Sequence, residues 1–259
     1  MKRFSFRGIQ GLGLLAATGL LVCAMYAQSP APANEKKQAA PQETKSTAPL
    51  AGIERGTFNI YVDAEQKGTE EFDLEPVGNQ FVAKGKIHLT ITRDENPVQY
   101  FIETELVLKP DYDPVRYSMA QKFEGNTSSI IMTFQANKAT ADFKTGSGTE
   151  TRDYQLTPGV ALLDDNVFHH YALLARRYNY DKGGLQEFSA FIPQESIGGI
   201  LHIIYKGDET IDLGGKSVPV QHLLVDTNDL KLDLYVEGKE HRMVKMEVPS
   251  SKVMVVRQK

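Results

Sequence analysis

Histidines and carboxylates are the residues of this chain whose types could support chemistry, and two of the histidines are adjacent. His169 and His170 follow Asp164 and Asp165 by about one helical turn, so one histidine could pair with a carboxylate. Adjacent residues of a helix point about 100° apart, and the two rings therefore cannot chelate one metal ion as an i, i+4 pair would. We expect these histidines to pack or to cap rather than to bind metal or catalyse.

Two further histidines lie in strand patterns. His202 has the parity of Ile200 and Ile204, and His222 has the parity of Val220. If those apolar residues face the interior, both histidines enter a cavity there. A hydrogen-bonded core histidine is the ordinary alternative for each.

Motifs that would define a reaction are absent from the sequence. It holds no Gly-x-Ser-x-Gly elbow, no phosphate-binding glycine-rich loop and no dinucleotide fingerprint. Cys23 is the single cysteine, so cleavage after it excludes disulfides, thiolate catalysis and cysteine metal sites from the mature chain. We predict no catalytic residue, no metal ligand and no cofactor. Whether the protein is an enzyme stays open, with a non-enzymatic role favoured.

The paired histidines belong to the one stretch with a helical pattern, about residues 164–180. Asp164, Asp165 and Asn166 are good N-cap residues, and Gly183-Gly184 is a stop signal. An apolar stripe recurs at i, i+4, i+7 and i+11 and consists of Val167, Tyr171, Leu174 and Tyr178. We expect this stripe to face a curled sheet, either as the plug of the core or as one wall of a ligand cavity.

Two segments precede the folded part. Residues 1–27 begin with Lys2, Arg3 and Arg7 and continue as an apolar run without acidic residues, a pattern typical of a secretory signal. Residues 28–52 are rich in Pro, Ala, Gln and Lys, which predicts a disordered linker. The sequence thus predicts export to the periplasm or outside the cell, with no transmembrane segment in the mature chain. Lipid anchoring at Cys23 is disfavoured because a valine, rather than a small residue, precedes it.

The charge balance narrows the partners. The formal net charge of the chain is -4, and the predicted signal holds three cations and no anions, so the mature chain is more acidic still. Acidic chains without a basic cluster are poor candidates for binding nucleic acid or anionic lipid surfaces. We therefore predict no nucleic-acid partner.

From residue 53 onward the sequence alternates between apolar and polar residues in about fourteen short runs. The clearest runs are 81–92 and 98–109, and short turns rich in Gly, Pro, Asn and Asp join them. One wet face and one apolar face favour an antiparallel sheet, which has to twist and curl. We predict one mainly β domain at 53–259, a large antiparallel meander curled as an open or half barrel around the single helix. A closed barrel with an external helix and a two-sheet sandwich are the alternatives.

The start of this domain carries a resemblance. Gly56-x-Phe58-x-Ile60-Tyr61, followed by Lys67-Gly68-Thr69-Glu70, resembles the first hairpin of exported half-barrel proteins of the bacterial envelope. The predicted architecture is similar to that of lipoprotein-localisation factors and of several exported families of unknown function. The resemblance implies a cavity between sheet and helix that holds an acyl chain or another apolar group. It carries over no site residue, because no functional motif matches.

Three functions are compatible with these patterns. The first is a non-enzymatic envelope protein that binds an apolar or amphipathic, lipid-like ligand between the sheet and the helix. The second is a structural or interaction module that docks to an envelope protein through a sheet edge or through Arg176-Arg177. The third is a hydrolase with a dispersed site built on His169, His170 or His202. The predicted cavity residues for the first function are Val167, Tyr171, Leu174, Tyr178, His202 and His222.

Overall fold

The computed structural model describes residues 52–93, 95–227 and 230–258 of the 259-residue chain. The signal predicted at 1–27, with Cys23, and nearly all of the linker predicted at 28–52 lie outside the described residues. Within the described ranges, no helix combines the length and the apolar character that crossing a membrane requires.

Within the described ranges, fifteen strands form a single sheet, and strands that follow one another along the chain are paired except β8 and β9, which lie at opposite edges. The first eight strands are β1 (Glu54–Val62), β2 (Glu65–Val77), β3 (Gln80–Arg93), β4 (Asn96–Leu108), β5 (Pro114–Phe123), β6 (Asn126–Gln135), β7 (Lys138–Thr145) and β8 (Gly148–Gln155). The other seven are β9 (Ala161–Leu162), β10 (Leu185–Ile192), β11 (Ile197–Asp212), β12 (Ser217–Asp226), β13 (Lys231–Glu237), β14 (Arg242–Val248) and β15 (Val253–Arg257). The sheet runs from β8 at one edge, through the antiparallel pair of β1 and β15, to β9 at the other edge, where β9 lies parallel to β10.

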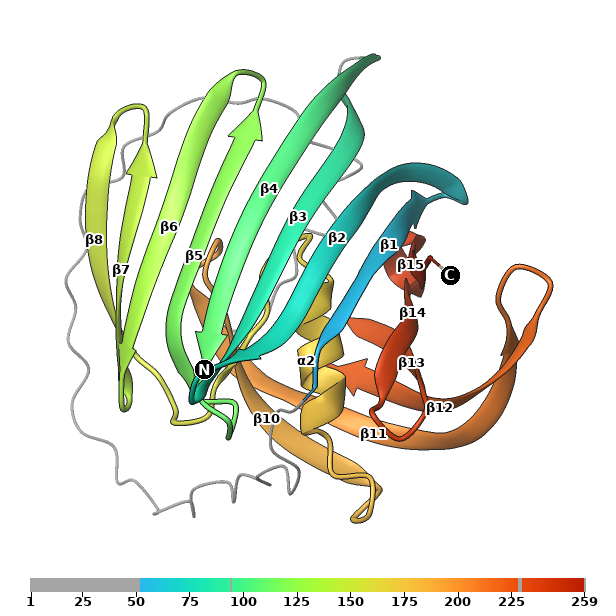
Figure 1. Ribbon diagram of the computed structural model, residues 1–259. Coiled ribbons are helices and arrows are strands. Elements are labelled where there is room, and N and C mark those ends of the chain that lie inside the picture. Colours follow the sequence, from blue (N-terminus) through green and yellow to red (C-terminus); the bar gives the residue numbers. More distant parts are fainter. Residues whose placement is uncertain (1–51, 94, 228–229, 259) are drawn as a thin grey trace, which may run out of the picture.

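The predicted fold class is confirmed. The sheet is open, and within the described part of the chain α2 (His169–Arg177) is the one α-helix, accompanied by the short 3-10 turn η1 (Pro249–Ser251). Figure 1 shows the sheet curling around α2, with β2 to β8 on one side and β10 to β14 on the other. The edge strand β8 contacts the turn between β10 and β11, which lies near the opposite edge of the sheet. The contact joins the Tyr154 hydroxyl to the Ser196 hydroxyl at 2.7 Å.

The alternating pattern explains where the core lies. In β3, Ala83, Ile87 and Leu89 are buried, whereas Lys84 and Lys86 between them are exposed. Residues two apart on a strand share one face of a sheet, and the buried set packs together with α2 in one continuous core. We call the face that carries α2 the inner face and the opposite one the outer face.

The helix begins later than the sequence predicts, at His169 rather than near Asp164. Asn166 has a left-handed φ of 61°, which interrupts the expected first turn. Asp164 does not cap the helix, because its carboxylate accepts hydrogen bonds from the Tyr117 hydroxyl and from the backbone N–H of Gln194. The capping acceptor comes instead from β2, where Glu70 Oε2 accepts the backbone N–H groups of Phe168 and His169.

The predicted apolar stripe is packed into the core. Its four members are at most 2% exposed, and every residue from His169 to Ala175 is buried as well. The helix also ends early, at Arg177, because Tyr178 takes an extended conformation. α2 is therefore surrounded by protein, as the plug of the curled sheet. The stripe consists of Val167, Tyr171, Leu174 and Tyr178.

Candidate functional site

The structure places His202 and His222 on the outer face, which corrects the expectation that they enter a cavity beside the helix. On β11 it is Leu201 and Ile203 that are fully buried, so His202 points the other way and lies 3.2 Å from Glu187. Parity alone could not decide this, because β11 carries aliphatic residues on both faces. The two histidines are therefore not brought together with the helix stripe.

His222 is held by two carboxylates on the outer face. Its Nδ1 atom lies 2.9 Å from Glu209 Oε1 and its Nε2 atom lies 2.7 Å from Asp233 Oδ1. The ring also stacks on Tyr235 at a centroid distance of 4.7 Å. With both ring nitrogens occupied, His222 has no nitrogen left for a ligand.

The two arginines at the end of α2 are engaged within the fold. Arg176 forms an ion pair with the buried Glu54 of β1. Arg177 donates to the carbonyl of Gly159, and its guanidinium lies 5.7 Å from the ring centroid of Tyr112. These contacts make Arg176-Arg177 a poor surface for docking a partner protein.

The polar residues at the start of α2 form a buried centre. Glu70 and His169 are both 0% exposed, and Glu70 Oε1 lies 2.7 Å from His169 Nδ1. Gly85 makes room for this pair, since a Cβ atom there would lie 2.5 Å from His169 Cε1. This pairing could not be predicted from spacing, because Glu70 is 99 residues from His169.

Burial keeps this pair uncharged. Removal from water raises the pKa of Glu70 well above its usual value, although two backbone N–H groups act in the opposite direction. The same cause lowers the pKa of His169 to about 3. The stable arrangement is therefore a protonated Glu70 carboxyl that donates to Nδ1 of a neutral imidazole.

Two aspartates complete the buried centre. Burial raises the pKa of Asp164 to about 6, against the hydrogen bond from the Tyr117 hydroxyl at 2.6 Å. Burial, together with the charges of Glu195 and Asp164, raises the pKa of Asp165 to about 8. Asp165 Oδ1 has no hydrogen-bond partner among the described residues.

The buried centre has the residue types of a catalytic site, but a substrate cannot reach them. His170 is 1% exposed and both its ring nitrogens lack partners within the described part of the chain. No group of three or more potential ligands among the described residues could hold a metal ion. The pair of Glu70 and His169 therefore meets the distance that a hydrolase would need, but not in a pocket that a substrate can enter.

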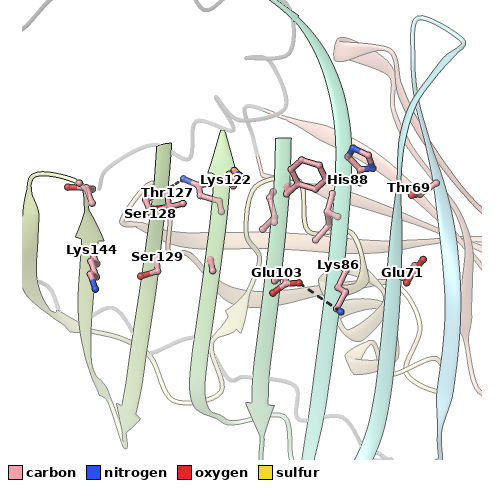
Figure 2. A pocket seen from close by; sticks show the side chains of 17 residues that line it. Thr69, Glu71, Lys86, His88, Glu103, Lys122, Thr127, Ser128, Ser129 and Lys144 are labelled. Atoms are coloured by element: carbon pink, nitrogen blue, oxygen red, sulfur yellow. Dashed lines mark hydrogen bonds and ion pairs between the residues drawn. The ribbon is translucent and has the colours of Figure 1, made fainter. Parts of the chain in front are cut away.

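An open groove lies elsewhere, on the outer face of β2 to β7. Its volume is about 1050 Å³, which is within the range of small-molecule sites. Figure 2 shows side chains that line the groove on the neighbouring strands β2 to β7. Its lining combines hydroxyls, ammonium groups, carboxylates and one ring pair, and consists of Thr69, Glu71, Lys86, Ile87, His88, Phe101, Ile102, Glu103, Ala120, Gln121, Lys122, Thr127, Ser128, Ser129, Lys144, Thr145 and Gly146.

A second hollow of about 400 Å³ continues this groove along β3 to β6. The two hollows share the lining residues Lys86, Glu103, Ala120 and Ser129, so they form one depression, which we call the outer groove. The second hollow adds Ile131 of β6 to the lining.

Exposed apolar side chains cross the outer groove diagonally. Phe101 of β4 is 42% exposed and Ile131 of β6 is 44% exposed, while Ala120 lies on β5 between them. In the pairing register Ala120 is opposite Glu103 of β4 and Ser129 of β6. Phe101 is two residues from Glu103, and Ile131 is two residues from Ser129. Phe101 also stacks on His88 at a centroid distance of 4.3 Å.

The sequence patterns described above do not predict this groove, although they contain a signal for it. The runs 100–102 and 130–132 are apolar at every position, so they break the alternation that a face turned only to water would keep. Such a break indicates that both faces of β4 and β6 carry apolar surface.

Comparisons with known proteins do not identify the chain. No protein-family model matches it, and no curated protein is significantly similar. A solved structure of a DUF1089 family protein from Pseudomonas aeruginosa is similar with 12% sequence identity and a TM-score of 0.42, over 70% of this chain and 90% of that one. A likeness at this level carries no argument about function. The resemblance to lipoprotein-localisation factors stays a prediction.

Proposed function

We propose that this is an exported, non-enzymatic binding protein that holds a lipid-like, amphipathic ligand in the outer groove. The observation that carries the proposal is the exposed apolar diagonal of Phe101, Ala120 and Ile131 along the floor of a large depression. Exposed apolar surface gathered in a groove favours binding of an apolar group, because contact removes it from water.

The outer groove is a better place for the ligand than the space between sheet and helix. The stripe that was expected to line that space is packed, with Val167 and Leu174 at most 1% exposed. None of the four stripe residues lines either hollow of the outer groove. We therefore retain the lipid-like ligand that the sequence suggests, and we place it in the outer groove instead of between the sheet and the helix.

A hydrolytic function is less well supported by the same geometry. The buried pair of Glu70 and His169 is closed to solvent, and the lining of the outer groove contains neither His202 nor His222. His88 does line the groove, but its Nε2 atom lies 2.6 Å from the side-chain oxygen of Gln99, a neutral amide that gives no general-base partner.

Export is part of the proposal and is supported by the basic, then apolar, pattern of residues 1–27. The test is fractionation of cells that express the full chain, followed by mass spectrometry of the N-terminus. A mature protein that starts after residue 24 or 27 and lies outside the cytoplasm is expected. Retention of Met1 in a cytoplasmic fraction would contradict this part of the proposal.

Ligand binding is tested by two matched substitutions of exposed aliphatic residues. Ile131→Ser removes apolar surface from the groove floor, whereas Leu185→Ser removes it from β10, where Leu185 is 55% exposed and outside the groove. Burying half of an isoleucine side chain contributes about 1 kcal/mol, so Ile131→Ser should raise the Kd of a fluorescent dansyl fatty acid about fivefold.

Native mass spectrometry of protein purified from its host completes the test. We expect an extra mass that organic solvent removes. Equal affinities of Ile131→Ser and Leu185→Ser for the fluorescent probe, together with an unliganded native mass, would reject binding in the outer groove.

A further inference from the structure

Two lysines flank β6 at one end of the outer groove. Lys122 of β5 is opposite Thr127 of β6 in the pairing register, and Lys144 of β7 is opposite Ser129 of the same strand. Thr127 and Ser129 are two residues apart and therefore on one face. Figure 2 shows both lysines and both hydroxyl residues on the groove side of the sheet, with β6 between the two ammonium groups.

The other cations of the groove each lie near a carboxylate. Lys86 Nζ lies 3.9 Å from Glu103 Oε1, and Lys84 Nζ lies 3.9 Å from Glu105 Oε2. Arg116 Nη1 also lies 3.6 Å from Glu105 Oε1. On the β3 to β5 side of the groove, three cations thus share two carboxylates.

Lys122 and Lys144 differ from that group. No ion pair joins either of them to a carboxylate within the described part of the chain. The acidic residue nearest along β7 is Asp142, whose Oδ1 accepts the hydroxyl of Thr151 on the far neighbour β8 at 2.6 Å, so its carboxylate is held on the side away from β6. The groove lining contributed by β5 to β7 contains no carboxylate, so the two ammonium groups at this end lie beside two hydroxyl donors.

We propose that the ligand carries an anionic headgroup, a phosphate, sulfate or carboxylate, that binds between Lys122 and Lys144. The hydroxyls of Thr127 and Ser129 donate to its oxygens, and the apolar part runs over Ile131, which is two residues from Ser129 on the same face. This inference rests on the proposed function and adds the charge and the orientation of the ligand.

The acidic net charge of the chain does not oppose this site. A net charge of -4 opposes attachment to a broad anionic surface, where the field of the whole protein acts. A single anionic group between two ammonium groups interacts over a few ångströms, and charges farther away than about 10 Å are screened at ordinary salt. The site thus selects one anionic molecule rather than a membrane surface.

The experiment compares two probes with the same twelve-carbon chain, dodecyl phosphate and the neutral dodecyl maltoside, both below their micelle concentrations. Binding to the purified protein is measured by isothermal titration calorimetry. The groove variant is Lys122→Gln/Lys144→Gln. The control variant Lys138→Gln/Lys239→Gln makes the same change of charge at exposed lysines outside the groove lining.

We expect the wild type and the control to bind dodecyl phosphate about tenfold more tightly than dodecyl maltoside, a preference that higher salt reduces. The groove variant should lose this preference and keep its affinity for the maltoside. Equal binding of both probes by the wild type, or an unchanged preference in the groove variant, would overturn the anionic headgroup and leave the groove itself intact. Failure of the wild type to bind either probe would overturn both the inference and the proposed function.

Discussion

Replacing Glu70 tests whether the buried pair at the start of α2 is uncharged. Glu70→Gln keeps the shape of a protonated carboxyl, since its NH2 group can donate to His169 Nδ1 and its oxygen can accept the N–H groups of Phe168 and His169. Glu70→Met has a similar volume and can make none of these hydrogen bonds. The two variants therefore separate the hydrogen bonds from the charge.

The magnitudes follow from the contacts that each variant loses. Glu70→Met leaves three buried groups without a partner, the backbone N–H groups at 3.1 and 3.0 Å and His169 Nδ1 at 2.7 Å. Each such group costs about 1–3 kcal/mol, and burial of the methionine offsets part of the total, so we expect a loss of about 4 kcal/mol. Glu70→Gln should stay within about 1 kcal/mol of the wild type.

The assay is urea unfolding at pH 7 followed by far-ultraviolet circular dichroism, with thermal unfolding as a second measurement. A loss of about 4 kcal/mol lowers the Tm by roughly 8–16 °C in a domain of this size. If the pair were ionised, Glu70→Gln would strand a buried imidazolium and cost about 3–5 kcal/mol. Equal losses for the glutamine and methionine variants would thus refute the neutral pair.

Two further predictions concern the same buried centre. Gly85→Ala should lower the unfolding free energy by about 1–3 kcal/mol in the same urea assay, because the new Cβ atom would overlap the buried His169 ring. The control Gly146→Ala should have little effect, since no atom lies within 4 Å of its new Cβ. Equal stabilities of the two variants would contradict the packing around His169. The pKa of Asp165 is about 8 in the folded state, compared with 3.8 for the free group. The folded state therefore binds this proton more tightly than the unfolded state does, and wild-type stability should fall as pH rises from about 4 to 8. Asp165→Asn should remove that part of the pH dependence and raise the Tm at pH 8 more than at pH 5, and an unchanged Tm profile would contradict the raised pKa.

The fold could be predicted because each strand is marked by its own local pattern of apolar and polar residues. Alternation in runs such as 81–92 identified strands with one wet face, and short turns required a meander. The pairing of β1 with β15, which joins the two ends of the domain, was not predictable from spacing. This pairing joins residues far apart in the sequence, such as Ile60 and Val255, and no local pattern indicates which distant strands meet.

The start of the helix was mispredicted for a physical reason. Asp164, Asp165 and Asn166 have the composition of an N-cap, but Asp164 is used by Tyr117 of β5 and by Gln194. A capping group from another part of the chain, Glu70, replaces it. Local capping rules cannot detect a cap that arrives from a distant strand.

The candidate site was predicted least well, because its residues are ordinary one by one. Lys122, Thr127 and Lys144 carry no motif, and they become a group only through the register of β5, β6 and β7. The histidines attracted more notice in the sequence, yet His169 is buried and His202 is held by Glu187 on the outer face. Both histidines could support chemistry by their residue type, but the fold engages their side chains in contacts with other residues of the protein.

The buried centre and the outer groove lie back to back on the same strands. Glu70 faces inward beside Glu71 of the groove, Gly85 beside Lys86, and the buried Thr104 beside Glu103. A helix of nine residues is too short to be stable alone, and the first turn of α2 depends on Glu70 for its cap.

Loss of that cap would therefore loosen the inner support of β2 to β4, whose outward side chains form one wall of the groove. Glu70→Gln should accordingly keep the affinity for dodecyl phosphate, and Glu70→Met should weaken it although it changes no groove residue. If a folded Glu70→Met protein bound the probe as tightly as the wild type, the groove would be independent of the plug behind it.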